Sequence, residues 1–116
     1  MLIGELSEHT GASTRALRYY EQRQLLESDR DSNGYRRYGS DAVLRVHQIR
    51  ALIGAGFTCD VIARLLPCAA GNPPKIELCP SVAADMRSVL RDLEAKLGEL
   101  DRQRQAIGHL LVDASD

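Results

Sequence analysis

The sequence has no tryptophan and a single phenylalanine, Phe57, and aromatic residues make up only 4% of its 116 residues. Its core must therefore be built from leucine, isoleucine, valine and alanine, which favours helices over a β-sandwich. No segment approaches the run of about 18 apolar residues that a membrane span needs. The first residues carry acids where a signal peptide would be basic. These absences predict a mainly α-helical, cytoplasmic protein that does not contact a membrane.

Lysine is also scarce, because arginine supplies thirteen of the fifteen basic residues. The formal net charge of −1 excludes a globally basic nucleic-acid-binding protein. Residues 1–50 carry a net charge of +1 and residues 51–116 a net charge of −2. This difference is too small to indicate a basic domain, so a nucleic-acid-binding surface has to be sought in the local placement of the arginines. The sequence offers no phosphate-binding loop, paired-carboxylate pocket or nucleophile–base motif, and we predict that the protein is not an enzyme.

The first third of the chain shows the pattern of a helix-turn-helix. Residues 2–9 predict a short helix that Gly11 ends, and Ser13 is a good N-cap for a second helix over residues 14–24. Two short helices joined by a tight turn containing glycine are typical of DNA-binding proteins. An ordinary pair of packed helices is the alternative interpretation of this segment.

The next segment predicts a β-hairpin. Asn33-Gly34 is a strong turn signal because both positions tolerate positive φ. A strand over residues 35–38 would place Tyr35 and Arg37 on one face and Arg36 and Tyr38 on the other. Since a two-stranded hairpin is not stable alone, it must pack on the helices and project outward as a wing. A solvated surface hairpin without function is the alternative.

Two further helices should complete the first domain. Ser40 can cap a helix that runs to about Gly54, and Thr58 can cap a helix that ends at Leu66, before Pro67. The third helix has an expected buried stripe of Val43, Leu44, Val46, Ile49, Leu52 and Ile53. Residues 67–78 are rich in proline and glycine and predict a loop. Cys79 would then be the N-cap of a helix that starts at Pro80.

The last predicted helix, residues 80–111, would be roughly 48 Å long, which exceeds the diameter of a small domain. Its apolar residues recur at steps of four and three, interrupted at Arg104. Few apolar residues remain elsewhere to cover such a helix, so a coiled coil between two copies is favoured over packing on its own domain. The expected seam consists of Met86, Leu90, Leu93, Leu97, Leu100, Ile107 and Leu111.

These elements in this order resemble the MerR family of bacterial transcription regulators. The match is carried by IGELSEHTGASTRALRYYEQRQLL at residues 3–26, SNGYRRY at 32–38 and GAGFT at 54–58. The resemblance implies a winged-helix homodimer joined by an antiparallel coiled coil. It also implies that the dimer binds a two-fold symmetric operator in promoter DNA and distorts the promoter spacer in response to an effector, so that RNA polymerase can use both promoter elements.

The resemblance assigns the DNA contacts to the helix at residues 14–24 and to the wing. The helix would lie in the major groove, where side chains reach base edges, while the wing would contact phosphates. Arg18 is the preferred base or phosphate contact, and Tyr38 is expected to serve mainly in packing. The candidate DNA-binding residues are Thr14, Arg15, Arg18, Tyr19, Tyr20, Tyr35, Arg36, Arg37 and Tyr38.

The effector is less evident. In the family's metal-sensing branch one cysteine begins the dimer helix, as Cys79 does here, but a later cysteine pair is missing from this sequence. The three cysteines, Cys59, Cys68 and Cys79, do not match an iron–sulfur site either. They remain candidates for a thiol switch, in which Cys68 and Cys79 form a disulfide or react with an electrophile. A soft-metal site at Cys68 and Cys79, with a third donor such as His47 or His109 from the other subunit, and simple buried thiols are the alternatives.

The sequence therefore predicts a winged-helix domain over residues 1–66, a linker or effector loop over 67–79, a dimerisation helix over 80–111 and a tail over 112–116. Any signal should act within residues 57–85. The predicted function is a homodimeric, effector-gated transcription regulator of the MerR type. The alternative is a coiled-coil interaction adaptor whose winged helix binds DNA weakly.

Overall fold

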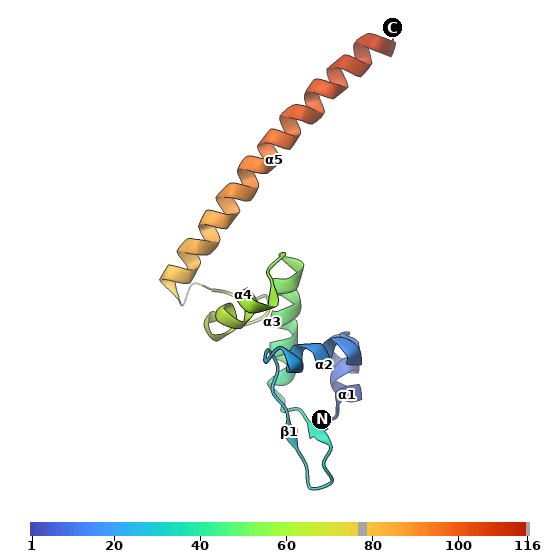
Figure 1. The fold of residues 1–116 in the computed structure, drawn as a ribbon, viewed down its shortest axis with the longest axis vertical. Helices are drawn as coiled ribbons and strands as arrows, with labels where there is room; N and C mark the ends of the chain where they lie inside the picture. The colour runs from blue at the N-terminus through green and yellow to red at the C-terminus, as the bar shows by residue number, and fades with distance from the viewer. Residues whose placement is uncertain (77–78, 116) are drawn as a thin grey trace. The chain divides into compact units, whose positions relative to one another are not determined.

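The structure is a computed structural model that describes residues 1–76 and 79–115, without the side chains of residues 112–115. The chain divides into two units, Met1–Cys79 and Pro80–Asp116, which are described separately. The first unit contains four helices, a short 3₁₀ helix and one antiparallel hairpin, and the second is a single helix, α5 (Figure 1). No helix within the described residues is long and apolar enough to cross a membrane.

The predicted helix-turn-helix is present as α1 (Ile3–Thr10) and α2 (Thr14–Gln22). Gly11 ends α1 in the left-handed region at φ 77°, and its N–H donates to the carbonyl of Ser7. The Ser13 hydroxyl caps α2 by accepting the N–H of Ala16 at 3.0 Å. The helix ends two residues earlier than expected, because Gln24 adopts φ 64°.

The wing consists of β1 (Asp29–Arg30) and β2 (Arg36–Arg37), paired antiparallel with Asp29 opposite Arg37 and Arg30 opposite Arg36. The hairpin predicted around Asn33-Gly34 is present, and of these two residues only Gly34 adopts a positive φ, at 81°. Residues 31–35 join the strands, and because the Asp31 N–H donates to the Tyr35 carbonyl at 2.9 Å, three residues lie inside this last backbone pair. The turn is closed by the Gly34 N–H, which donates to the Asp31 carbonyl at 3.0 Å.

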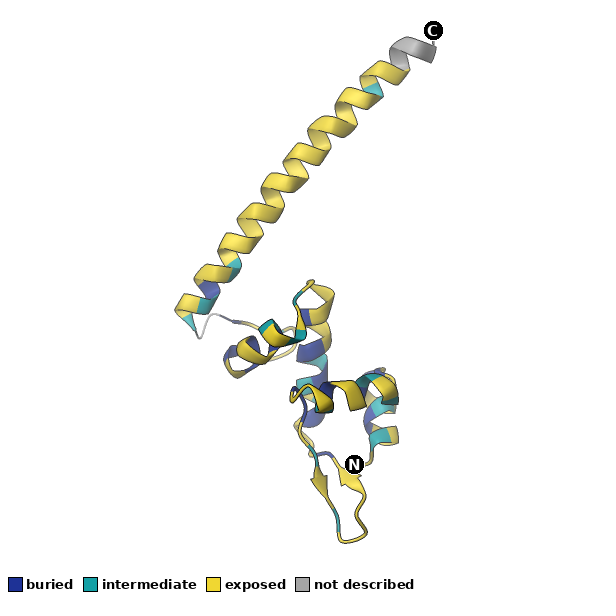
Figure 2. Ribbon diagram, in the orientation of Figure 1, coloured by how far each residue is buried: buried dark blue, intermediate teal, exposed yellow. Residues whose placement is uncertain are grey.

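The core of the first unit centres on α3 (Ala42–Gly54), which packs against α1 and α4 (Cys59–Leu65). Figure 2 shows buried residues concentrated in these helices. Its largest fully buried side chains are Leu6, Leu17, Val46, Ile49 and Ile62. Helix α3 begins after Asp41, so the prediction that Ser40 caps it is wrong. Leu44 and Ile53 are more than 40% exposed, contrary to expectation; Leu44 lies about 200° around the helix from Val46, and Ile53 lies in the last turn.

Helix α4 begins as predicted, with the Thr58 hydroxyl accepting the N–H of Val61 at 3.3 Å. The short helix η1 (Leu66–Cys68) follows, and Ala70 then pairs with Lys75 through two backbone hydrogen bonds. Side chains of α3 hold this segment: Arg45 donates to the Leu66 carbonyl at 3.4 Å and Gln48 to the Gly71 carbonyl at 3.2 Å. The loop predicted at 67–78 is therefore structured over its described part, while residues 77 and 78 lie outside the described residues.

Helix α5 runs without interruption from Pro80 to Ser115. Its 36 residues correspond to a length of about 54 Å. Gly98 and Gly108 both lie within the helix and do not interrupt it. The helix continues past the predicted end at residue 111, and the expected tail is helical through Ser115. Most of its large apolar residues are exposed: Val89, Leu90, Leu93, Leu97, Leu100, Ile107, Leu110 and Leu111 lie between 46% and 69%.

Candidate nucleic-acid interface

Helix α2 has one face in the core and one face in solvent. Leu17 and Tyr20 are buried, whereas Arg15, Arg18 and Tyr19 are exposed and Thr14 is half-buried. The spacing of three between Leu17 and Tyr20 places them together and turns the intervening arginine and tyrosine outward. The exposed face therefore carries two arginines and an aromatic ring that are free of core packing.

A groove of about 720 Å³ brings part of this face together with the wing. Arg18 of α2 lines it with Tyr35 and Arg36 of the wing, which are the residues that the sequence assigns to base and phosphate contacts. Residues of α1 also line the groove, where Glu5 and Glu8 add negative charge. Two segments that are far apart in the sequence thus present guanidinium and phenol groups to one open surface.

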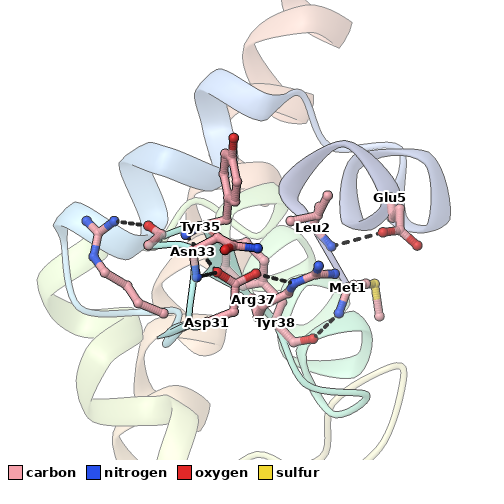
Figure 3. Close-up of polar contacts among 10 residues, drawn as sticks. Met1, Leu2, Glu5, Asp31, Asn33, Tyr35, Arg37 and Tyr38 are labelled. Atoms are coloured by element: carbon pink, nitrogen blue, oxygen red, sulfur yellow. Dashed lines mark hydrogen bonds and ion pairs between the residues drawn. The ribbon is translucent and has the colours of Figure 1, made fainter.

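Asp31 organises the tip of the wing (Figure 3). Its Oδ1 accepts the N–H groups of Asn33 at 2.9 Å and Tyr35 at 3.0 Å, and its Oδ2 accepts Nε of Arg37 at 3.0 Å. The hydrogen bond from Arg37 holds the pKa of Asp31 below its ordinary value of 3.8, and the two backbone donors act in the same direction. Tyr35 remains 64% exposed. The tip is thus held by its own residues, with the ring of Tyr35 left free.

The base of the wing is tied to α2 and to the start of the chain. Nε of Arg36 lies 3.3 Å from Oε2 of Glu21 in α2. Tyr38 exchanges two backbone hydrogen bonds of 2.7 Å with Met1. Figure 3 marks the one that the Met1 amino group donates to the Tyr38 carbonyl. The predicted alternation along this strand is present, because Arg36 and Tyr38 both approach Glu21 while Arg37 turns to Asp31.

Two of the candidate tyrosines, Tyr20 and Tyr38, lie in the core with exposures of 7% and 2%. Burial raises the pKa of both phenols above the ordinary value of 10.0, and the Glu21 carboxylate adds to the effect at Tyr38. Tyr38 thus packs as expected. The ring of Tyr20 packs beneath the surface that carries Arg18 and Tyr19.

The sequence reasoning missed two residues of this surface, Arg30 and Glu21. Arg30 is exposed, lines the groove and donates to the Gly34 carbonyl at 2.8 Å. The signal that could have found it is its position before the turn, directly opposite Arg36 in the hairpin register. Glu21 gave no comparable signal, because an acid in the last turn of a short helix suggests only a solvated residue.

The cysteines separate into a bonded pair and a free thiol. Cys68 and Cys79 form a disulfide with Cα atoms 5.8 Å apart. Cys59 is a half-buried free thiol whose Sγ lies 4.0 Å from Oη of Tyr19. No cluster of three or more histidine, cysteine or acidic residues that could hold a metal occurs in the part of the chain that the structure describes. These residues do not fit a metal site, because the two paired sulfurs bond to each other.

A helix-turn-helix followed by a wing, with exposed arginines on both, defines a winged helix-turn-helix DNA-binding protein. Comparison with known proteins assigns the chain to one family within this class. Residues 1–68 match the family described as "MerR HTH family regulatory protein". The chain therefore belongs to the MerR family of transcriptional regulators.

Similar proteins include the HTH-type transcriptional regulator HmrR of Rhizobium leguminosarum bv. viciae. It is 30% identical over 115 residues, which is 96% of this chain and 84% of HmrR. Nodulation protein NolA of Bradyrhizobium elkanii is 39% identical over 99 residues, or 78% of this chain. The match spans only 45% of NolA, so this chain corresponds to less than half of that protein.

Two solved structures have the same fold. HiNmlR, a MerR family regulator lacking the sensor domain and bound to promoter DNA, has a TM-score of 0.59 at 20% identity and covers 96% of this chain and 86% of its own. PbrR691 of Ralstonia metallidurans CH34, in complex with lead(II), has a TM-score of 0.53 at 28% identity, covering 90% and 86%. Relatives of this chain thus include a DNA-bound regulator and a metal-bound one.

Proposed function

We propose that this protein binds promoter DNA as a homodimer, with α2 in the major groove and the wing on the phosphate backbone. The observation that supports this most directly is the groove that gathers Arg18, Tyr35 and Arg36 from two separate elements. Guanidinium groups suit both guanine edges and phosphates, and phenol hydroxyls can donate to phosphate oxygens. We assign Thr14, Arg15, Arg18 and Tyr19 to the helix contacts and Tyr35, Arg36 and Arg37 to the wing contacts.

The second copy is proposed from α5. From Leu90 to Leu111 its large apolar residues remain about half exposed or more, which is costly for a helix that stays unpaired in water. A second copy of the same helix, running antiparallel, would cover the stripe. The residues assigned to this contact are Met86, Leu90, Leu93, Leu97, Leu100, Ile107 and Leu111.

Through such a dimer the protein would act on RNA polymerase indirectly, by bending and untwisting the promoter spacer between the two polymerase elements. The cost of that deformation depends on the sequence of the spacer, so specificity would extend beyond the contacted bases.

The proposed signal is oxidation of the Cys68 and Cys79 thiols by thiol–disulfide exchange. A low-molecular-weight disulfide oxidises the two thiols: the protein gains the Cys68–Cys79 bond, and the small disulfide takes up two electrons and two protons as two thiols. Because Gln48 and Arg45 attach this segment to α3, and Arg50 of α3 donates to the Thr10 carbonyl of α1 at 2.6 Å, a change at the pair can reach the helix-turn-helix.

Gel shift on the DNA upstream of the protein's own gene tests the DNA-binding proposal. We expect a retarded complex that competitor DNA of shuffled sequence displaces poorly. Absence of a complex at low salt would reject the proposal in favour of the alternative, an interaction adaptor.

The redox proposal is tested on the same DNA in dithiothreitol and in oxidised glutathione. We expect the affinity of the wild-type protein to differ between the two conditions, and Cys68→Ser to abolish the difference. Cys59→Ser is the matched control, because Cys59 lies outside the disulfide. Mass spectrometry of the purified protein, native and then denatured, identifies the oxidation state. A bound metal or an unchanged affinity would contradict the thiol switch.

A further inference from the structure

Glu21 connects α2 to both strands of the wing. It lies in the last turn of α2, and its side chain is only 19% exposed. Oε1 accepts the hydroxyl of Ser28, directly before β1. Oε2 accepts the hydroxyl of Tyr38 at 3.4 Å and forms an ion pair with Nε of Arg36 at 3.3 Å. One carboxylate therefore receives donors from both sides of the hairpin.

The ion pair leaves most of the Arg36 guanidinium available. The shortest distance of the ion pair, 3.3 Å, joins Nε to Glu21, and a guanidinium has five N–H donors. The side chain of Arg36 stays 43% exposed and lines the same groove as Arg18. Glu21 thus holds the arginine beside α2, while the terminal nitrogens of Arg36 form no hydrogen bond with any residue that the structure describes.

The charge of Glu21 alone would act against DNA binding, since a carboxylate repels phosphates. Its contacts with the wing, however, favour DNA binding indirectly. The tip of the wing is held by Asp31 within the hairpin, whereas the link from the hairpin to α2 through charged side chains runs through Glu21. Loss of this carboxylate would free the base of the wing from the helix while leaving the tip intact.

We propose that Glu21 is a positioning residue that sets the wing against the recognition helix, so that Arg36 and Arg18 meet the same DNA in register. This inference rests on the proposed DNA contact of Arg36. It assigns to an acidic residue a role in strengthening the binding of a polyanion.

The test compares Glu21→Ala with Glu27→Ala on the upstream DNA. Glu27 is an exposed acid six residues further along, and it forms no hydrogen bond or ion pair with any residue that the structure describes. Both substitutions remove one negative charge, but only the first removes the link to the wing. We expect Glu21→Ala to weaken specific binding about tenfold, and Glu27→Ala to leave it equal or slightly tighter.

A double-mutant cycle shows whether Glu21 acts through Arg36. In an Arg36→Ala background, Glu21→Ala should change the affinity by less than about twofold. Glu21→Gln keeps the acceptor oxygen and the volume, so it should bind with an affinity between those of wild type and Glu21→Ala. If a denaturation assay shows that Glu21→Ala does not fold, Glu21→Gln replaces it in the comparison with the Glu27 variant.

Two results would overturn the inference: equal effects of the Glu21 and Glu27 substitutions, or a full tenfold loss that persists without Arg36. These differ from a failure of the proposed function. If the wild-type protein does not bind the upstream DNA, the proposed function itself is wrong. If it binds and Arg36→Ala weakens it while Glu21→Ala does not, only the role of Glu21 is wrong.

Discussion

The two units of the chain differ in how far their apolar residues are buried. The first unit is Met1–Cys79, and the second is helix α5. In the first unit Leu6, Leu17, Val46, Ile49 and Ile62 are completely buried by neighbouring elements of the same unit. In α5, leucines and isoleucine at coiled-coil spacing are left about half exposed or more. The first unit has its own core, whereas α5 has an apolar stripe and no core.

This difference shows how one short chain divides its tasks. Exposed residues on α2 and the wing are mainly arginine and tyrosine, which suit a charged and aromatic partner, while the exposed residues that stand out on α5 are aliphatic and suit a copy of itself. The two surfaces should therefore fail independently when they are mutated.

The largest effect is expected from a charge in the stripe of α5. Leu97→Glu should weaken the dimer by about 100-fold or more, because each of the two copies loses roughly 1.5–3 kcal/mol of leucine burial. Analytical ultracentrifugation measures the dissociation constant. Lys96→Glu introduces the same side chain at the neighbouring position outside the stripe and should leave the dimer nearly intact. A dimer of equal strength in both variants would refute the proposed seam.

On the other surface, Arg36→Ala should weaken binding to all DNA sequences about tenfold and lower the salt dependence. The slope of log K against log salt should fall by about 0.9, corresponding to one phosphate contact. Fluorescence anisotropy across a salt series measures both. Arg64→Ala, at an exposed residue of α4 outside the groove, is the control. An unchanged slope would contradict a phosphate contact at Arg36.

A substitution at Gly11, between α1 and α2, should mainly lower the stability of the first unit and leave both proposed binding surfaces unchanged. Gly11 has φ 77°, and a Cβ there would lie 3.2 Å from an amino nitrogen of Arg50, which holds the end of α1. Gly11→Ala should therefore lower the free energy of unfolding by about 1–2 kcal/mol. Urea denaturation measures the change. Gly4→Ala, where no atom lies within 4 Å, should not destabilise the protein.

The smallest effect concerns alkaline pH, and it should arise only in the first unit, because all four tyrosines lie between residues 19 and 38. The raised pKa of Tyr38 means that the folded state favours the neutral phenol. This contribution to stability is complete below pH 10.0, the ordinary pKa, and is lost as the pH rises through the higher folded value. Urea denaturation at increasing pH should show a shallower decline for Tyr38→Phe. Identical declines in the two proteins would exclude this contribution.

Much of the fold could be predicted from short-range signals. Ser13, Thr58 and Gly11 mark helix ends that the structure confirms, since capping depends on neighbouring residues. Errors arose where the backbone had alternatives: Ser40 was as good a cap as Asp41, and the turn after Asp31 took three residues. The exposure of Leu44 depends on which elements pack around α3, which local patterns do not specify.

The candidate site was predicted less completely, for a related reason. Arg18, Tyr35 and Arg36 could be named from their motifs, and the structure brings them to one groove. Glu21 and Arg30 could not be predicted from the sequence, because their roles depend on contacts across the hairpin and between α2 and the wing. The Cys68–Cys79 bond was one of several alternatives at the sequence level, since spacing alone does not fix how cysteines pair.

The separation of α2 into a packed face and an exposed face has a consequence for how such a protein can change its target. Leu17 and Tyr20 secure the helix in the core, whereas Arg15 and Tyr19 lie on its exposed face. The exposed positions can be replaced one at a time without changing the proposed contacts of the wing with the DNA backbone. A library confined to Thr14, Arg15, Arg18 and Tyr19 would therefore sample new operator sequences on an unaltered scaffold.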